Sequence, residues 1–211
     1  MPAHTETLAL RTSDGLQLLA ELAQPEAGPP RSLMVLCHPH PQHGGNMHAT
    51  VIDWLFRELP GKGVACLRFN FRGVPGSEGS HDDGVGERLD VVAAIDSLGA
   101  RWPDVPLLIG GWSFGADVSL AVDHPRHSGW FSVAPPLAVV RVADMAAPTD
   151  PRPKLLAIPE HDQFNPPEKA TSTTEHWTNT TLEVVPNTDH FLAGGRIRVL
   201  DLALTQALPP T

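Results

Sequence analysis

Apolar residues along the chain follow two patterns, short unbroken runs and a spacing of three to four positions. The runs, such as residues 33–37, are typical of strands buried on both faces of a sheet. The spaced pattern, as in Val51, Leu55 and Leu59, is typical of helices that bury one side. Strands are predicted at 7–11, 16–22, 33–37, 64–69, 107–109, 129–133, 155–158 and 182–185. Helices are predicted at 48–59, 85–98, 114–122, about 168–177 and 196–208.

The order of these elements predicts an α/β fold. From residue 33 onward strands alternate with helices, which favours a mostly parallel central sheet with helices on both faces. The first two strands flank an Asp14-Gly15 turn, a strong hairpin signal, so we expect an antiparallel hairpin at one edge. A length of 211 residues favours one domain spanning 1–211. In such sheets, chemistry gathers where the strands end at their carboxyl side.

The charge of the chain argues against several classes of partner. Fifteen Lys and Arg against 24 Asp and Glu give a formal net charge of −9. Nucleic acids and anionic membranes attract basic surfaces, so we expect neither as a partner. No apolar run approaches the roughly 20 residues of a membrane-spanning helix, and the amino terminus lacks the pattern of a signal peptide. Together these features predict a cytoplasmic protein.

The two cysteines, Cys37 and Cys66, lie in predicted buried strands. Two cysteines in a chain of this length do not form a disulfide framework. We therefore expect buried, reduced thiols at both positions.

The segment Gly111-Trp112-Ser113-Phe114-Gly115 is the first candidate for chemistry. A Gly-x-Ser-x-Gly pattern occurs by chance, but here it follows a predicted buried strand and opens a predicted helix, which is the context of a nucleophile elbow. The glycines would relieve crowding in a turn that exposes the serine hydroxyl. The alternative is a glycine-rich turn with an idle serine. We predict that Ser113 is the nucleophile.

A serine nucleophile needs a histidine base and a carboxylate that orients the base. In this type of fold the order along the chain is serine, acid, histidine. Asp162 follows the strand at 155–158 and His190 follows the strand at 182–185, so both lie in the expected loops. Three nearby residues are alternatives to this pair. Glu160 could be the acid, whereas we interpret Asp189 as a brace for its loop and His161 as a loop or pocket residue.

The turn from His38 to His48 contains four histidines. One interpretation is a metal site that uses His38 and His40. The favoured interpretation is an oxyanion hole, which needs one backbone N–H from the residue after the nucleophile and one from this loop. Pro39 has no N–H, so the predicted donors are Phe114 and His40, with no metal. The sequence does not define the roles of His38, His43 and His48.

The chain contains the motifs HPHP at 38–41, GGNM at 44–47, LRFNFRG at 67–73, GSEG at 76–79 and GWSFG at 111–115. Taken together, these motifs resemble a known family, the small bacterial α/β-hydrolases related to dienelactone hydrolase. The resemblance implies the α/β-hydrolase fold without a lid domain and a triad of Ser113, Asp162 and His190. In the acid loop the family usually has a Gly-Asp pair, where this chain has Glu160-His161-Asp162.

Arg68, Asn70 and Arg72 lie at a strand end within the same family motif. Charged residues there could bind a substrate carboxylate. More often they connect loops through hydrogen bonds, and we favour that role.

Only about 20 residues separate the strands at 129–133 and 155–158, too few for a lid. Trp112, Phe164 and Phe191 flank the triad in sequence and either wall an apolar pocket or belong to the core. We therefore expect a serine hydrolase, most simply a carboxylesterase acting on a small-molecule ester without a cofactor. A thioesterase, a peptidase-like hydrolase, a metal-dependent hydrolase and a non-catalytic binding module are the alternatives. The oligomeric state is left open, and a homodimer is one option.

Overall fold

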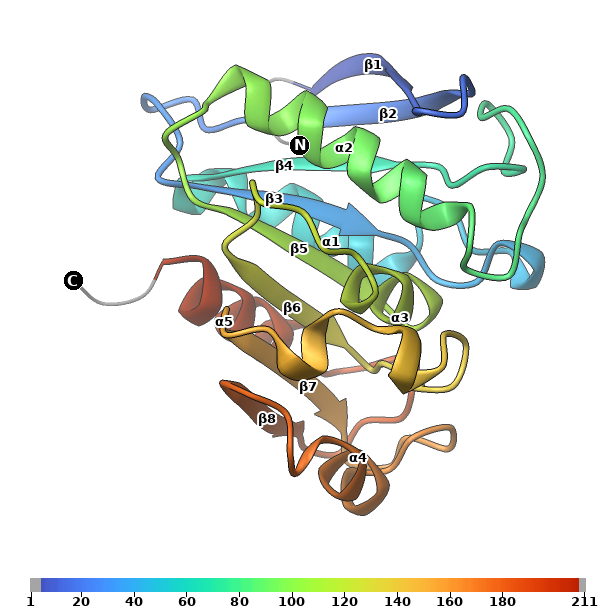
Figure 1. Cartoon of the computed structure of the whole chain (residues 1–211). Coiled ribbons are helices and arrows are strands. Elements are labelled where there is room, and N and C mark those ends of the chain that lie inside the picture. The colour runs from blue at the N-terminus through green and yellow to red at the C-terminus, as the bar shows by residue number, and fades with distance from the viewer. Residues whose placement is uncertain (1–4, 209–211) are drawn as a thin grey trace.

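The computed structural model describes residues 5–208 of the chain and contains one eight-stranded sheet (Figure 1). The strand order is β1-β2-β4-β3-β5-β6-β7-β8. The strands are β1 (Thr5–Arg11), β2 (Gln17–Ala23), β3 (Ser32–Cys37), β4 (Val64–Phe69), β5 (Leu107–Trp112), β6 (Gly129–Val133), β7 (Lys154–Pro159) and β8 (Thr180–Val185). The predicted strands therefore occur in the predicted order, with ends shifted by a few residues.

Antiparallel pairing is confined to one edge of the sheet. β1 pairs antiparallel with β2, and β2 pairs antiparallel with β4. The pairs from β4 through β3 to β8 are all parallel. In the hairpin turn the N–H of Thr12 donates to the carbonyl of Leu16, the N–H of Leu16 donates to the Thr12 hydroxyl, and Gly15 has a φ of 95°. This arrangement confirms the predicted fold class.

Helices cover both faces of the sheet, as Figure 1 shows. α2 and α3 pack on one face, and α1 and α5 pack on the other. α4 packs beside β7 at the far edge. The α-helices are α1 (Thr50–Glu58), α2 (Glu87–Arg101), α3 (Phe114–Leu120), α4 (Pro167–Thr174) and α5 (Arg196–Ala207). The short 3₁₀ helices are η1 (Pro41–His43), η2 (Pro60–Lys62), η3 (Val142–Asp144) and η4 (Ala147–Thr149).

β3 shows how an unbroken apolar run serves two faces. Leu33, Val35 and Cys37 belong to the core under α2 and α3. Met34 and Leu36 belong to the core under α1 and α5. Side chains alternate between faces along a strand, so a central strand needs apolar residues at every position. Cys37 and Cys66 are both buried and free, as predicted.

The loops that follow β3, β5, β7 and β8 meet at the carboxyl end of the parallel strands, on the right in Figure 1. Between β6 and β7 the chain forms only η3 and η4 and contains no lid. Within residues 5–208, no helix has the length and apolarity needed to span a membrane.

Candidate active site

Ser113 lies in a strained turn between β5 and α3. Its φ of 56° and ψ of −120° are rare for a residue with a side chain. A Cβ at Gly111 would overlap the backbone of Gly115, and a Cβ at Gly115 would overlap the carbonyls of Cys37 and His38. Both glycines are therefore required by close backbone packing, which confirms the crowding expected from the sequence. The turn presents the Ser113 hydroxyl at the amino end of α3.

His190 and Asp162 complete a hydrogen-bonded relay with Ser113. His190 Nε2 lies 2.8 Å from Ser113 Oγ, and His190 Nδ1 lies 2.8 Å from Asp162 Oδ2. A carboxylate only accepts, so Nδ1 carries the proton and Nε2 is free to accept the serine proton. Asp162 and His190 are both buried. The structure thus brings together the three side chains that the sequence placed in separate loops.

The second oxygen of Asp162 is held by its own loop. Asp162 Oδ1 accepts the N–H groups of Phe164 at 2.8 Å and Asn165 at 3.1 Å. Asn165 also donates its side-chain amide to the carbonyl of Pro135 at 2.9 Å. These bonds leave Oδ2 directed at His190. Sequence analysis missed Asn165, because its partner is 30 positions away.

The base loop is anchored from two sides. Trp112 Nε1 donates to the carbonyl of His190 at 3.2 Å. The N–H of His190 donates to Gln163 Oε1 at 3.4 Å, and the N–H of His161 donates to the carbonyl of Thr188 at 2.8 Å. These bonds connect the acid loop to the base loop and hold both catalytic candidates in place.

The rival residues lie outside the relay. Glu160 accepts the N–H of Asn187 at 2.7 Å, which braces the base loop. Asp189 accepts the N–H of Phe191 at 3.0 Å within its own turn. His161 is exposed, with its Nε2 3.9 Å from Glu160. Each rival therefore has a local role that differs from that of Asp162 or His190.

Asp117, on α3, holds the loop that follows β6. Its buried carboxylate accepts the N–H groups of Leu137, Ala138 and Val139 at 2.9–3.0 Å. Burial raises the pKa of Asp117 to about 6, although the three N–H groups favour its charged form. The same loop contains the Pro135 carbonyl that binds Asn165. No local pattern in the sequence indicates this contact, because its partners lie 20 to 22 positions away.

The two predicted oxyanion donors lie side by side. The rings of His40 and Phe114 have centroids 4.9 Å apart. Among residues 5–208, no acceptor takes the backbone N–H of either residue. The loop reaches the elbow because Gly115 packs directly on the end of β3, and it turns back because Gly45 packs directly on the Pro39 carbonyl. An oxyanion hole requires N–H donors without an acceptor inside the protein, and both of these N–H groups meet that condition.

His38 is a structural residue. It is fully buried, and its Nδ1 lies 2.6 Å from the carbonyl of Pro39. Its Nε2 accepts the N–H of Phe71 at 3.0 Å, so both nitrogens are used by the backbone. Burial lowers the pKa of His38 to about 4. The metal alternative needed His38 as a ligand, and this arrangement leaves it no free nitrogen.

The other histidines of this turn differ in their surroundings. His43 packs its ring on His40 with centroids 4.6 Å apart. His48 is half exposed and lies 4.0 Å from Glu21. Within the described part of the chain, no group of three His, Cys, Asp or Glu side chains is arranged to bind a metal ion.

Arg68 and Arg72 connect loops, the role that the sequence favoured. Arg68 binds Glu21 at 2.7 Å and Asp53 at 2.8 Å. Arg72 binds the buried Asp90 at 2.7 Å and also contacts Asp14.

Asn70 has a similar role. It accepts the N–H of Met47 at 2.8 Å and donates to the carbonyl of Pro75 at 2.8 Å. These polar groups are therefore engaged within the protein.

The three aromatic candidates for a pocket wall separate into two kinds. Phe164 and Phe191 are 53% and 58% exposed, and their rings lie 4.6 and 5.8 Å from the ring of His190. Trp112 belongs to the core under α1 and α5, because its place on β5 directs it to that face. Trp112 contacts His190 from the buried side through its indole N–H. Of the three aromatic residues, the two phenylalanines are the ones exposed beside His190.

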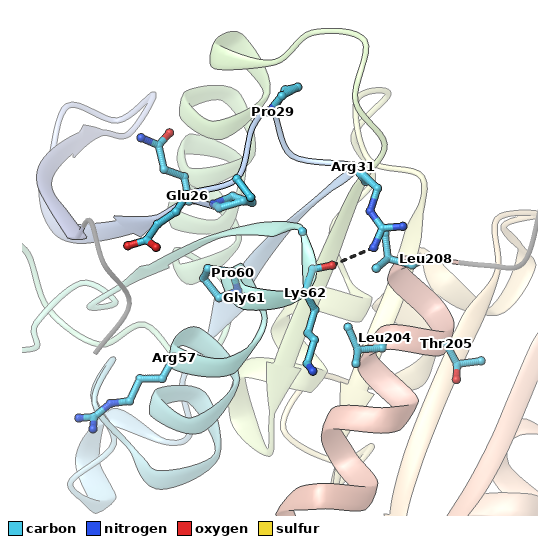
Figure 2. A pocket seen from close by; sticks show the side chains of 14 residues that line it. Glu26, Pro29, Arg31, Arg57, Pro60, Gly61, Lys62, Leu204, Thr205 and Leu208 are labelled. Carbon is cyan, nitrogen blue, oxygen red and sulfur yellow. Dashed lines mark hydrogen bonds between the residues drawn. The ribbon is translucent and has the colours of Figure 1, made fainter.

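A groove of about 1160 Å³ lies at the opposite end of the sheet (Figure 2). Its wall includes Arg31, Lys62 and Leu208, and Arg31 donates to the Lys62 carbonyl at 3.0 Å. None of the relay residues lines this groove. The chemistry of the relay, rather than the size of a hollow, therefore identifies the candidate site.

Comparison with known proteins agrees with this geometry. A solved structure from Xanthomonas campestris, described as an α/β serine hydrolase without lid, has a TM-score of 0.86 and 30% identity, covering 100% of this chain and 98% of that chain. An α/β serine hydrolase homologue from Coxiella burnetii has a TM-score of 0.83 and 29% identity, covering 93% and 94%.

Comparison with sequences of known proteins covers less of the chain. An uncharacterized protein of Rickettsia prowazekii is 36% identical over 121 residues, which is 56% of this chain and 51% of that protein. The match thus spans about half of that relative. No protein-family model matches the chain.

Proposed function

The chain belongs to the α/β serine hydrolases without a lid, and from this premise we propose that it is a carboxylesterase that cleaves small or short-acyl esters. The observation that carries the proposal is the relay of Ser113, His190 and Asp162, with both hydrogen bonds at 2.8 Å. A histidine held in one tautomer by a buried carboxylate and in contact with a serine hydroxyl is the arrangement that activates the serine.

The proposed reaction has two halves. His190 Nε2 takes the hydroxyl proton while Ser113 Oγ attacks the ester carbonyl. The carbonyl oxygen becomes an oxyanion that accepts hydrogen bonds from the N–H groups of Phe114 and His40. His190 then gives its proton to the departing alkoxide, and the alcohol leaves an acyl-enzyme. Water, deprotonated by His190, attacks the acyl carbon to form a second oxyanion. When it collapses, the bond to Ser113 Oγ breaks, His190 returns its proton to Oγ, and the carboxylic acid is released.

The surface around the relay supports a small substrate. Phe164 and Phe191 offer exposed apolar faces beside His190, but no lid covers them. A short acyl or aryl group could bury one side on these rings, whereas a long chain would stay in water. The resemblance to dienelactone hydrolases stays a prediction.

Turnover of p-nitrophenyl esters tests the proposal. We expect hydrolysis of the acetate and butyrate, a lower kcat/KM for the octanoate, and loss of all three activities in Ser113→Ala. EDTA should leave the rates unchanged. Faster turnover of a matched thioester or anilide panel would replace the esterase with a thioesterase or peptidase-like enzyme. Absence of turnover on every panel would favour a binding module.

A further inference from the structure

His81 lies in the loop between β4 and α2, outside the relay, and packs on both proposed oxyanion donors. Its ring centroid is 4.9 Å from that of His40 and 5.3 Å from that of Phe114. The side chain is only 8% exposed. Figure 1 shows this loop descending to the turn η1 (Pro41–His43), on the right of the view. His81 thus packs against the side chains of the two residues whose N–H groups would bind the oxyanion.

Glu87, the first residue of α2, fixes the loop that carries His81. Its fully buried carboxylate accepts the N–H of Asp82 at 2.9 Å and the N–H of Gly84 at 2.9 Å. His81 Nδ1 lies 2.8 Å from Glu87 Oε1, but the contact lacks hydrogen-bond geometry. His81 Nε2 lies 3.2 Å from Asp83 Oδ1, again without hydrogen-bond geometry. The ring is therefore held by packing and by two nearby carboxylates, and Glu87 sets the position of the loop.

We propose that His81 is a positioning residue for the oxyanion hole and that Glu87 holds it in place. This inference rests on the proposed function. Oxyanion donors act only when they are fixed at about 2.7–3.1 Å from the developing charge. The Phe114 N–H is fixed by α3, whereas the His40 N–H lies in a loop. His81 supplies that loop with a buried packing surface against the His40 ring.

Three variants separate the packing of the His81 ring from its polarity. His81→Ala removes the ring, His81→Phe keeps a ring of similar size, and Glu87→Gln disturbs the acceptor for the two loop N–H groups. His176→Ala is the control, because that side chain is 90% exposed and lies just after the end of α4. For each variant, kcat and KM for p-nitrophenyl butyrate, the rate of fluorophosphonate labelling, the Ki of an alkylboronic acid and the Tm are measured.

We expect His81→Ala and Glu87→Gln to lower kcat about 10- to 100-fold, less than or similar to deletion of one oxyanion donor. The KM should stay within about threefold, since ground-state binding is not involved. The labelling rate should fall with kcat and the boronic acid Ki should rise with it, because both probes place a charged oxygen in the hole. His81→Phe should recover most of the loss, and His176→Ala should match the wild type.

Three results would overturn the proposal. One is a kcat within twofold of wild type in a folded His81→Ala protein. Another is a rise in KM alone, which would make His81 a substrate contact. The third is equal loss in His81→Phe and His81→Ala, with both folded. If His81→Ala does not fold, Glu87→Gln and His81→Phe still decide. If wild type is labelled but hydrolyses no ester, the proposed esterase fails while the labelling rates still test His81.

Discussion

At the scale of single residues, the acid of the relay is defined by its hydrogen bonds rather than by its charge. Glu160 and Asp162 are two positions apart and both are carboxylates. Asp162 has one oxygen fixed by two loop N–H groups and the other on His190. Glu160 instead braces Asn187. Of the two carboxylates, Asp162 is the one that contacts the imidazole of His190.

Replacing each carboxylate by its amide tests this distinction. Asp162→Asn should lower kcat by about 10³- to 10⁴-fold, because the amide favours the wrong tautomer of His190. Glu160→Gln, the matched control, should keep kcat within about threefold, since an amide oxygen still accepts the Asn187 N–H. Steady-state kinetics on p-nitrophenyl butyrate compare the two. A larger loss in Glu160→Gln would transfer the role of acid to Glu160.

At the scale of elements, the site depends on how closely strand ends approach each other. The start of α3 packs on the end of β3 through Gly115, where a side chain would overlap two carbonyls. This close approach brings the loop with His40 to the elbow with Ser113. The approach of the proposed nucleophile to the proposed oxyanion donors thus depends on strand packing.

An added methyl group at this contact should therefore be costly. Gly115→Ala should lower the free energy of unfolding by at least about 2 kcal/mol, because backbone atoms must shift. Gly61→Ala, with no atom near the added Cβ, should change it by no more than about 0.5 kcal/mol. Urea denaturation of both variants measures the difference. Equal stability of the two would show that the packing at Gly115 is looser than described.

At the scale of the whole molecule, buried histidines connect stability to pH. His38 and His127 are buried, and burial lowers the pKa of each to about 4. The unfolded chain binds a proton on each near pH 6.5. Between pH 6.5 and 4 the unfolded state holds more protons, so stability is complete above pH 6.5 and is lost as pH falls.

Removing one of these imidazoles should flatten that dependence. His38→Gln should lose part of the fall in unfolding free energy between pH 7 and pH 4.5, a contribution of up to about 3 kcal/mol. His176→Gln, at an exposed position, should keep the full fall. Urea denaturation at several pH values measures how the unfolding free energy of each variant changes with pH. An unchanged slope in His38→Gln would mean that this histidine titrates normally in the folded protein.

The sequence predicted most of the architecture because local patterns encode it. The unbroken run of β3 and the Asp14-Gly15 turn are local signals for a central strand and for the hairpin. The relay was also predictable, since each member follows a strand in a fixed order. The contacts that hold the relay in place were not predictable. The contacts of Asp117, Asn165 and His81 join residues from different loops, and no local pattern specifies such partners. The core position of Trp112 likewise depends on which way β5 faces.

The central claim is that Ser113 is an activated nucleophile, and covalent labelling tests it most directly. The protein is incubated with a fluorophosphonate, and the adduct is located by intact-mass and peptide mass spectrometry. We predict one phosphonyl group on Ser113, no labelling in Ser113→Ala, and labelling slowed about 10³-fold or more in His190→Ala, because the hydroxyl loses its base. Labelling elsewhere, or a wild-type protein that stays unlabelled while folded, would contradict the claim.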